Sequence, residues 1–198
     1  MMRSVIAPGL ATLDRVWSAR TEVERVTRFV VLAAVGTVLL WAAAKVQVPF
    51  FPVPATLTTL VVVLIGAFYG SRLGAATILA YLTEGLAGLP VFAGTPEKGI
   101  GLAYMVGPTG GYLIGYVAAA FLVGLLVERG WGRSIVAMIG AVFAGNVALY
   151  AAGIAWLGYL IGFDKAITYG LVPFLAADAL KILIAAAITV AASRRIAR

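Results

Sequence analysis

The residues best suited to bind a small solute are an aspartate and a lysine in the last apolar segment of the chain. Asp178 and Lys181 are three positions apart, so on a helix they share one face. Near the centre of a bilayer each costs about 2.5–3.5 kcal/mol, which pairing, water or a polar ligand must offset. They are either an ion pair that fixes helix packing or a carboxylate and an ammonium that bind a solute. We favour solute binding, because ionisable residues inside a membrane are functional by default. Pro173 predicts a nearby helix start, which places both charges in the outer half of the membrane, within reach of an external ligand.

Other polar side chains are candidates for the same pocket. Glu84, near the end of the third apolar segment, either lines a pocket or extends to the membrane interface. Asn146 is four positions from Tyr150, and it either bonds to a neighbouring helix or lines the pocket. Thr58 opens the second apolar segment, where it either caps a helix or contacts a ligand. Tyr112 belongs either to the interfacial aromatic belt or to the pocket wall.

The composition is that of an integral membrane protein. Of the 198 residues, 63% are hydrophobic and only 12% are charged. The sequence has no Cys and no His, which excludes disulfides and thiol chemistry and disfavours zinc, haem and nucleophilic triads. The net charge of +7 comes from basic residues that flank apolar segments, which favours membrane topology over nucleic-acid binding. We therefore predict no enzyme activity, no cofactor and no metal site.

Six apolar segments must position these residues. They are 29–47, 56–69, 73–87, 110–127, 135–161 and 171–192, and they predict an all-α bundle of six transmembrane helices. The second and third are short for a hydrocarbon core about 30 Å thick. We expect residues 1–27 to form a cytoplasmic basic leader and residues 28–198 a single six-helix membrane domain.

The basic residues predict the orientation of the bundle. If both termini are cytoplasmic, every arginine of the sequence falls on the inner side, and the outer loops 48–55, 88–109 and 162–170 carry only two lysines. Prolines exclude a helix through 48–55, and 88–109 is long enough for a lid or a binding loop. Lys45, at the outer end of the first segment, is expected to extend toward the interface.

Motifs in four parts of the chain together resemble the BioY family, the biotin-binding S component of energy-coupling factor (ECF) transporters. In order, they are Val53–Leu60, Gly85–Gly94, Gly107–Gly115 and Pro173–Lys181. The likeness spans roughly residues 30–192. The chain departs from the family pattern where Thr58 replaces a common Gln, and where residues 95–99 replace a plain glycine run.

The resemblance implies a six-helix S-component fold in the bacterial plasma (inner) membrane and high-affinity capture of biotin from outside. It also implies coupling to a transmembrane T protein and to a pair of cytoplasmic ATPases. By the same resemblance, Asp178 and Lys181 contact the polar groups of biotin, namely its ureido N–H donors, ureido carbonyl and carboxylate. Small residues of the first helix would contact the T protein, with Ala33 and Thr37, or Ala42–Ala44, as candidates.

A second hypothesis is a carrier that acts alone and is coupled to protons or other ions. In that case Asp178 or Glu84 would titrate, transport would need no ATPase, and an uncoupler would abolish it. We see no inverted repeat of broken helices between the two halves of the sequence, which disfavours this hypothesis. An intramembrane enzyme is disfavoured more strongly, because Asp178 with Lys181 is the only close pair of ionisable residues within the apolar segments.

Overall fold

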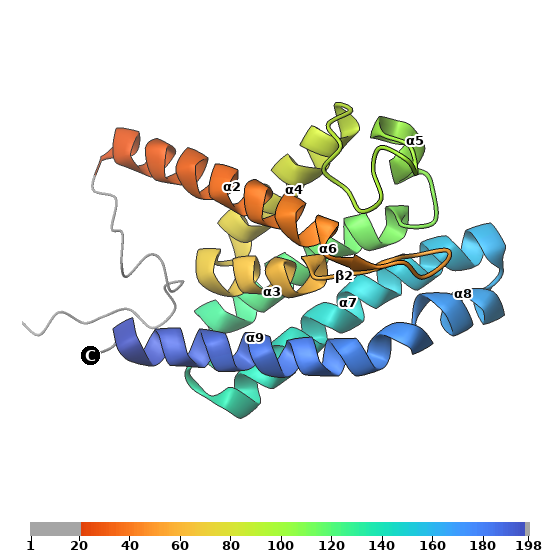
Figure 1. Cartoon of the computed structure of the whole chain (residues 1–198). Helices are drawn as coiled ribbons and strands as arrows, with labels where there is room; N and C mark the ends of the chain where they lie inside the picture. The colour runs from red at the N-terminus through yellow and green to blue at the C-terminus, as the bar shows by residue number, and fades with distance from the viewer. Residues whose placement is uncertain (1–20, 197–198) are drawn as a thin grey trace, which may run out of the picture.

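A computed structural model of the chain describes residues 21–196, and most of them lie in helices (Figure 1). The longer helices are α2 (Glu22–Lys45), α3 (Thr58–Tyr69), α4 (Ser71–Leu86), α6 (Gly110–Glu128), α7 (Ile135–Ile161) and α9 (Leu175–Ile196). The shorter elements are the strands β1 (Gln47–Val48) and β2 (Ala55–Thr56), the helices α5 (Gly101–Met105) and α8 (Phe163–Gly170), and the 3-10 turns η1 (Trp131–Arg133) and η2 (Val172–Phe174). The predicted leader lies outside the described residues up to position 20.

Each predicted apolar segment overlaps one of the longer helices, which confirms the all-helical fold. Within residues 21–196, four helical stretches are long and apolar enough to cross a membrane, namely α2, α6, α7 and the stretch Phe163–Arg195 that includes α8 and α9. Because α3 and α4 are shorter, the count of six transmembrane helices stays a prediction. The loops predicted to be outer contain more structure than expected: paired strands flank 48–55, and α5 and α8 lie in the other two.

Helix α2 begins before its apolar stretch. The Thr21 hydroxyl accepts from the backbone N–H of Glu24 at 3.2 Å, and the Glu24 carboxylate accepts from the backbone N–H of Thr21 at 3.3 Å. This capping box fixes the helix start, and Glu22 adds a second acidic side chain in the first turn, where the helix dipole favours it. Residues 22–27, predicted to belong to the leader, are therefore helical, because the cap rather than the hydropathy sets the start.

Helix α6 is the centre of the bundle, and it packs against α3, α4 and α7. Glycines make these contacts close. A Cβ added at Gly115 would lie 2.7 Å from the carbonyl oxygen of Leu149 in α7, and a Cβ at Gly66 of α3 would collide with the backbone of Ala120. The turn between α3 and α4 depends on Gly70, whose φ of +83° is disfavoured for residues with a side chain.

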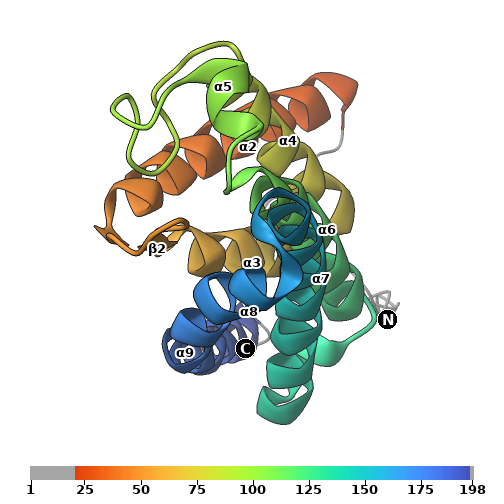
Figure 2. The ribbon, with the colours of Figure 1, turned by 90° about the vertical axis from the view of Figure 1, so that its right-hand side faces the viewer.

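The chain connections place two sets of segments at opposite ends of the bundle (Figures 1 and 2). The β-hairpin, α5 and α8 lie at one end, on the right in Figure 1 and facing the viewer in Figure 2. The start of α2, the α3–α4 turn, η1 and the end of α9 lie at the other. The arginines of the described residues lie in or beside this second set: Arg25, Arg28, Arg72, Arg129, Arg133, Arg194 and Arg195. The end that faces the cytoplasm stays a prediction of this charge bias.

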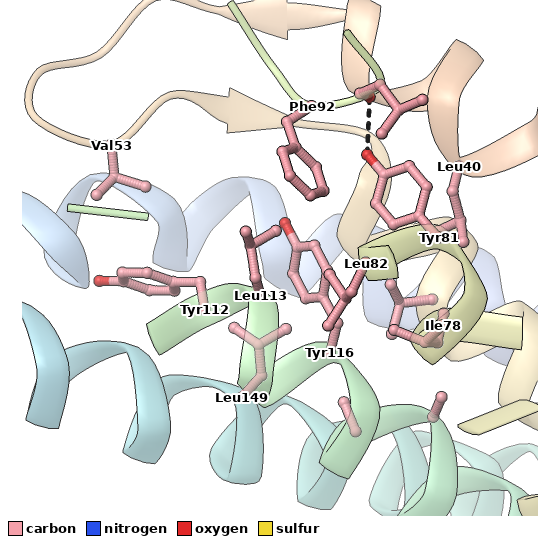
Figure 3. Close-up of a cluster of buried hydrophobic side chains, with 14 of the residues drawn as sticks. Leu40, Val53, Ile78, Tyr81, Leu82, Phe92, Tyr112, Leu113, Tyr116 and Leu149 are labelled. Atoms are coloured by element: carbon pink, nitrogen blue, oxygen red, sulfur yellow. Dashed lines mark hydrogen bonds between the residues drawn. The ribbon is translucent and has the colours of Figure 1, made fainter. Parts of the chain in front are cut away.

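The buried side chains among residues 21–196 form two clusters. The cluster beside η1 contains mostly small and aliphatic side chains, such as Val63, Val123, Met138, Val142 and Ala186. The larger cluster, on the side of the hairpin, is rich in aromatic rings, among them Tyr81, Phe92, Tyr104, Tyr112 and Tyr116. Figure 3 shows Leu113 and Tyr116 of α6 pointing toward Phe92 within this second cluster.

The small residues of α2 that the resemblance suggested for a partner contact are mostly used inside the chain. Ala33, Thr37, Ala43 and Ala44 are buried, because α2 packs on α3 and α4. Ala42 is exposed. In this conformation the Ala33 and Thr37 pair therefore cannot reach a partner. The exposed face of α2 carries large apolar side chains instead, including Val35, Val38, Leu39 and Trp41.

We predict that Gly115→Ala destabilises the protein by about 1–3 kcal/mol, because the added methyl group meets the backbone of α7 and the two helices must separate. Gly140→Ala is the matched control. Its Cβ would lie 3.3 Å from the Trp131 ring, a side chain that can shift, so we expect little change. Thermal unfolding in detergent measures both. Equal midpoints for the two variants would contradict the close packing of α6 on α7.

Candidate solute-binding site

The hairpin end of the bundle contains a cavity with an empty volume of about 560 Å³, counting the part that is open to solvent. Most of the wall consists of aromatic and aliphatic side chains from the larger buried cluster. Polar side chains from α3 and α9 also line it: Thr58, Thr59, Asp178 and Lys181.

Asp178 is placed at the cavity by the start of α9. The turn η2, which contains Pro173, leads into this helix, so Asp178 lies in its first turn, where the helix dipole favours a carboxylate. Its side chain is only 7% exposed. Oδ1 accepts from Nζ of Lys181 at 2.9 Å, and Oδ2 accepts from the hydroxyl of Tyr150. Each carboxylate oxygen therefore has a partner, and the carboxylate joins α9 to α7.

Lys181 joins α9 to two further elements. Its side chain is 14% exposed. Besides Asp178, Nζ donates at 2.9 Å to the carbonyl oxygen of Thr56 in β2 and at 2.9 Å to the hydroxyl of Thr59 in α3. An ammonium has three protons, so these contacts use all of its donors. The base of the hairpin and the start of α3 are thus fixed to the same lysine.

Another part of the wall is the segment 90–95, whose carbonyl oxygens are bonded to side chains of α2, α4 and α5. The ammonium of Lys45, a residue that we expected to extend toward the interface and that is exposed overall, bonds to this segment. Phe92, at 1% exposure, contributes its ring to the cavity wall. The bonds are Lys45 Nζ to Pro90 O (2.8 Å), Phe92 O (3.2 Å), Thr95 O (3.1 Å) and Thr95 Oγ1 (3.2 Å), Tyr81 OH to Val91 O (2.9 Å, Figure 3) and Tyr104 OH to Ala93 O (2.9 Å).

The structure brings together most of the residues predicted for the site. Asp178, Lys181, Thr58 and Tyr112 line one cavity. Tyr112 contributes its ring, because its hydroxyl donates to the carbonyl oxygen of Gly170 at 2.8 Å.

Among the described residues, the cavity lining does not include Glu84 or Asn146. Tyr81, Leu82 and Gly85 form the buried face of α4, and Glu84 lies beside that face with partial exposure. Asn146 is buried on α7, one turn closer to the arginine end than Tyr150, which does line the cavity. We therefore leave both residues out of the proposed site.

Four further tyrosines line the cavity, namely Tyr81, Tyr104, Tyr116 and Tyr150. For Tyr116 and Tyr150 the sequence left a pocket role open, whereas Tyr81 and Tyr104 were not predicted for the site. An aromatic residue near the end of an apolar segment is commonly an interfacial anchor, so residue type alone gave no signal. The spacing of four between Asn146 and Tyr150 did indicate one helix face, but not which end of that face is hollow. No group of Asp, Glu, His and Cys side chains within residues 21–196 could hold a metal ion.

Comparisons with known proteins agree on one family. The model of the BioY family matches residues 14–198. A probable biotin transporter BioY of Pyrococcus horikoshii is 38% identical over 160 residues, covering 81% of this chain and 88% of the relative. The biotin transporter BioY of Thermotoga maritima is 37% identical over 162 residues, covering 81% and 93%. The crystal structure of the S-component for biotin from an ECF-type ABC transporter shares the fold, with a TM-score of 0.70 at 23% identity over 91% of this chain and 96% of that one.

The buried pair predicts a coupled effect on stability. We expect Lys181→Met to lower the free energy of unfolding by about 3 kcal/mol, because it leaves the Asp178 carboxylate buried without its cation. The double variant Asp178→Asn, Lys181→Met should recover much of this loss, since neither charge then remains. Thermal unfolding of the parent, both single variants and the double variant, without ligand, gives the coupling energy. Additive effects of the two substitutions would show that the pair contributes no coupling.

Proposed function

Because this chain belongs to the BioY family, we propose that it captures biotin as the substrate-specific S component of an ECF-type transporter. The family consists of transport proteins rather than enzymes. The names of the relatives and the fold of the biotin S-component both support biotin as the solute. The observation that carries the proposal is the Asp178–Lys181 pair, buried at the wall of a largely aromatic cavity.

The chemistry of the cavity suits biotin. Biotin has an apolar bicycle and chain, ureido N–H donors, and acceptors on the ureido carbonyl and the carboxylate. The rings and aliphatic side chains of the wall accommodate the apolar parts, and Asp178 and Lys181 offer an acceptor and a donor in a water-poor environment, where hydrogen bonds are strong.

The contacts already present at the pair constrain how biotin binds. A carboxylate oxygen can accept more than one hydrogen bond, so Asp178 can take a ligand N–H and keep Lys181 and Tyr150. Lys181 has no proton to spare. A ligand oxygen that binds its ammonium must therefore replace one present acceptor, such as the Thr59 hydroxyl or the Thr56 carbonyl.

Energy for uptake must come from other proteins under this proposal. The sequence carries no phosphate-binding Lys–Ser/Thr motif, so ATP hydrolysis would be the task of partners. We propose a transmembrane T protein and a pair of cytoplasmic ATPases as those partners, with the chain embedded in a bacterial plasma membrane. Both termini would be cytoplasmic, and the hairpin end with its cavity would face outward, because the arginines gather at the opposite end.

Calorimetry with purified protein tests the binding role. We expect Asp178→Asn and Lys181→Met each to weaken biotin binding by about 10–100-fold, because each removes a hydrogen bond to a charged group. Asp164→Asn and Lys165→Met are the matched controls, since these exposed residues of α8 lie away from the cavity lining. Both controls should bind like the parent. A folded parent that does not bind biotin would refute the proposal, as would equal losses in the control variants.

Uptake assays test the energy source. In cells that supply the T protein and ATPases, we expect concentrative biotin uptake to require active ATPases and to persist when a protonophore collapses the proton gradient. Replacement of the phosphate-binding lysine of the ATPases provides the inactive control. Uptake that needs no ATPase and is abolished by the protonophore would instead support a carrier that acts alone.

A further inference from the structure

Side chains of three helices hold the backbone of the segment 90–95 in place. Side chains of α2, α4 and α5 donate to the carbonyl oxygens of residues 90, 91, 92, 93 and 95. Because these oxygens are bonded to side chains rather than to a regular helix or sheet, the shape of the segment depends on those donors. Phe92 and Ala93 of this segment line the cavity, so the donors also determine the shape of part of the cavity wall.

Lys45 makes the largest share of these contacts. Its ammonium lies 2.8–3.2 Å from four acceptors that share its three protons: the carbonyl oxygens of Pro90, Phe92 and Thr95 and the Thr95 hydroxyl. None of these acceptors is a carboxylate, so carbonyl dipoles stabilise the charge. The lysine is also the last residue of α2, where the helix dipole favours a cation. A cation in a shell of carbonyl oxygens draws separate parts of a loop toward one point.

The ring of Phe92 depends on the same shell. It packs edge-on against Tyr81 at 5.3 Å between ring centroids, and it stacks on Tyr104 at 5.0 Å. Gly85 of α4 leaves room for it, since a Cβ at that position would collide with the ring. Lys45 fixes the Phe92 backbone while these neighbours fix its ring. Contacts within the chain therefore fix both the backbone and the ring of this part of the wall.

We propose that Lys45 is a positioning residue that holds the segment 90–95 as a preformed wall of the binding cavity and thereby slows the exit of bound biotin. The role in binding rests on the proposed function, whereas the organisation of the wall does not. Without the ammonium, the carbonyl oxygens of Pro90, Phe92 and Thr95 each lose a hydrogen bond at once, so the wall opens more often. The Phe92 carbonyl oxygen then keeps only the hydrogen bonds from Thr95. The ligand then escapes faster, while its rate of association changes little.

Hydrogen–deuterium exchange of the ligand-free protein tests the wall itself. We expect the amides of residues 91–101 to exchange at least about 10-fold faster in Lys45→Met than in the parent, with the amides of α7 unchanged. Lys98→Met is the matched control, because it removes the same charge from an exposed side chain of the same loop. Its exchange should equal that of the parent. Parent-like exchange in Lys45→Met would overturn the proposal.

Biotin kinetics test the consequence for binding. We expect Lys45→Met to raise the dissociation rate by about 10–100-fold and to change the association rate by less than about threefold. If the lysine instead attracted the biotin carboxylate through space, the association rate would fall and would depend on salt, and Lys98→Met would share part of the effect. That result would overturn the positioning role. If the exchange results are as expected but the parent binds no biotin, the proposed function is refuted, whereas the proposed organisation of the wall is not.

Lys45→Arg supplies the test if Lys45→Met does not fold. It keeps the charge at the end of α2, but a planar guanidinium fits a shell of converging carbonyl oxygens less well than an ammonium does. We expect the amide-exchange rate of the wall and the biotin dissociation rate to lie between those of the parent and those of Lys45→Met. If Lys45→Met is unfolded, both rates of Lys45→Arg should be about 3–10-fold above those of the parent. Rates equal to those of the parent in both measurements would overturn the proposal.

Discussion

Two opposite charges buried in a nearly apolar bundle are the constraint on which the cavity end of this protein depends. Asp178 and Lys181 are both largely removed from water, and each needs every available partner. Their partners come from different elements: Tyr150 from α7, Thr59 from α3 and the Thr56 carbonyl from the hairpin. Satisfying the pair therefore fixes the relative positions of α3, α7, α9 and the hairpin, and these elements enclose much of the cavity.

Outside the cavity, the central helices of the bundle pack closely. Gly115 lets α6 approach the backbone of α7, and Gly66 does the same for α3 on α6. At the arginine end, the buried side chains are small and aliphatic and fill the space between helices. At the hairpin end, the hydroxyls of Tyr81, Tyr104 and Tyr112 donate to carbonyl oxygens of the connections between the longer helices, which fixes the positions of these large rings around the cavity. The contrast explains why the hollow part of the bundle is also its most aromatic part.

The sequence was sufficient to predict the helical segments and the central pair, for physical reasons that do not extend to the rest of the site. Hydropathy locates apolar helices such as α6 and α7 well, and an Asp and a Lys in an apolar segment are conspicuous because burying them is costly. Lys45 acts through contacts with a distant part of the chain, so no local pattern distinguishes it. Glu84 has a conspicuous charge, but whether it reaches the cavity depends on the rotation of α4, which tertiary packing sets, and the cavity lining does not include it.

The hydrogen bonds to the segment 90–95 have a consequence for how this part of the protein tolerates change. Lys45, Tyr81 and Tyr104 bond to carbonyl oxygens, and every amino acid supplies a carbonyl oxygen whatever its side chain. Substitutions within the segment can therefore alter what the wall presents to the cavity without removing the bonds that shape it. Ala93, a small residue that lines the cavity, is such a position. The segment is thus a natural starting point for redesigning which solutes the cavity accepts.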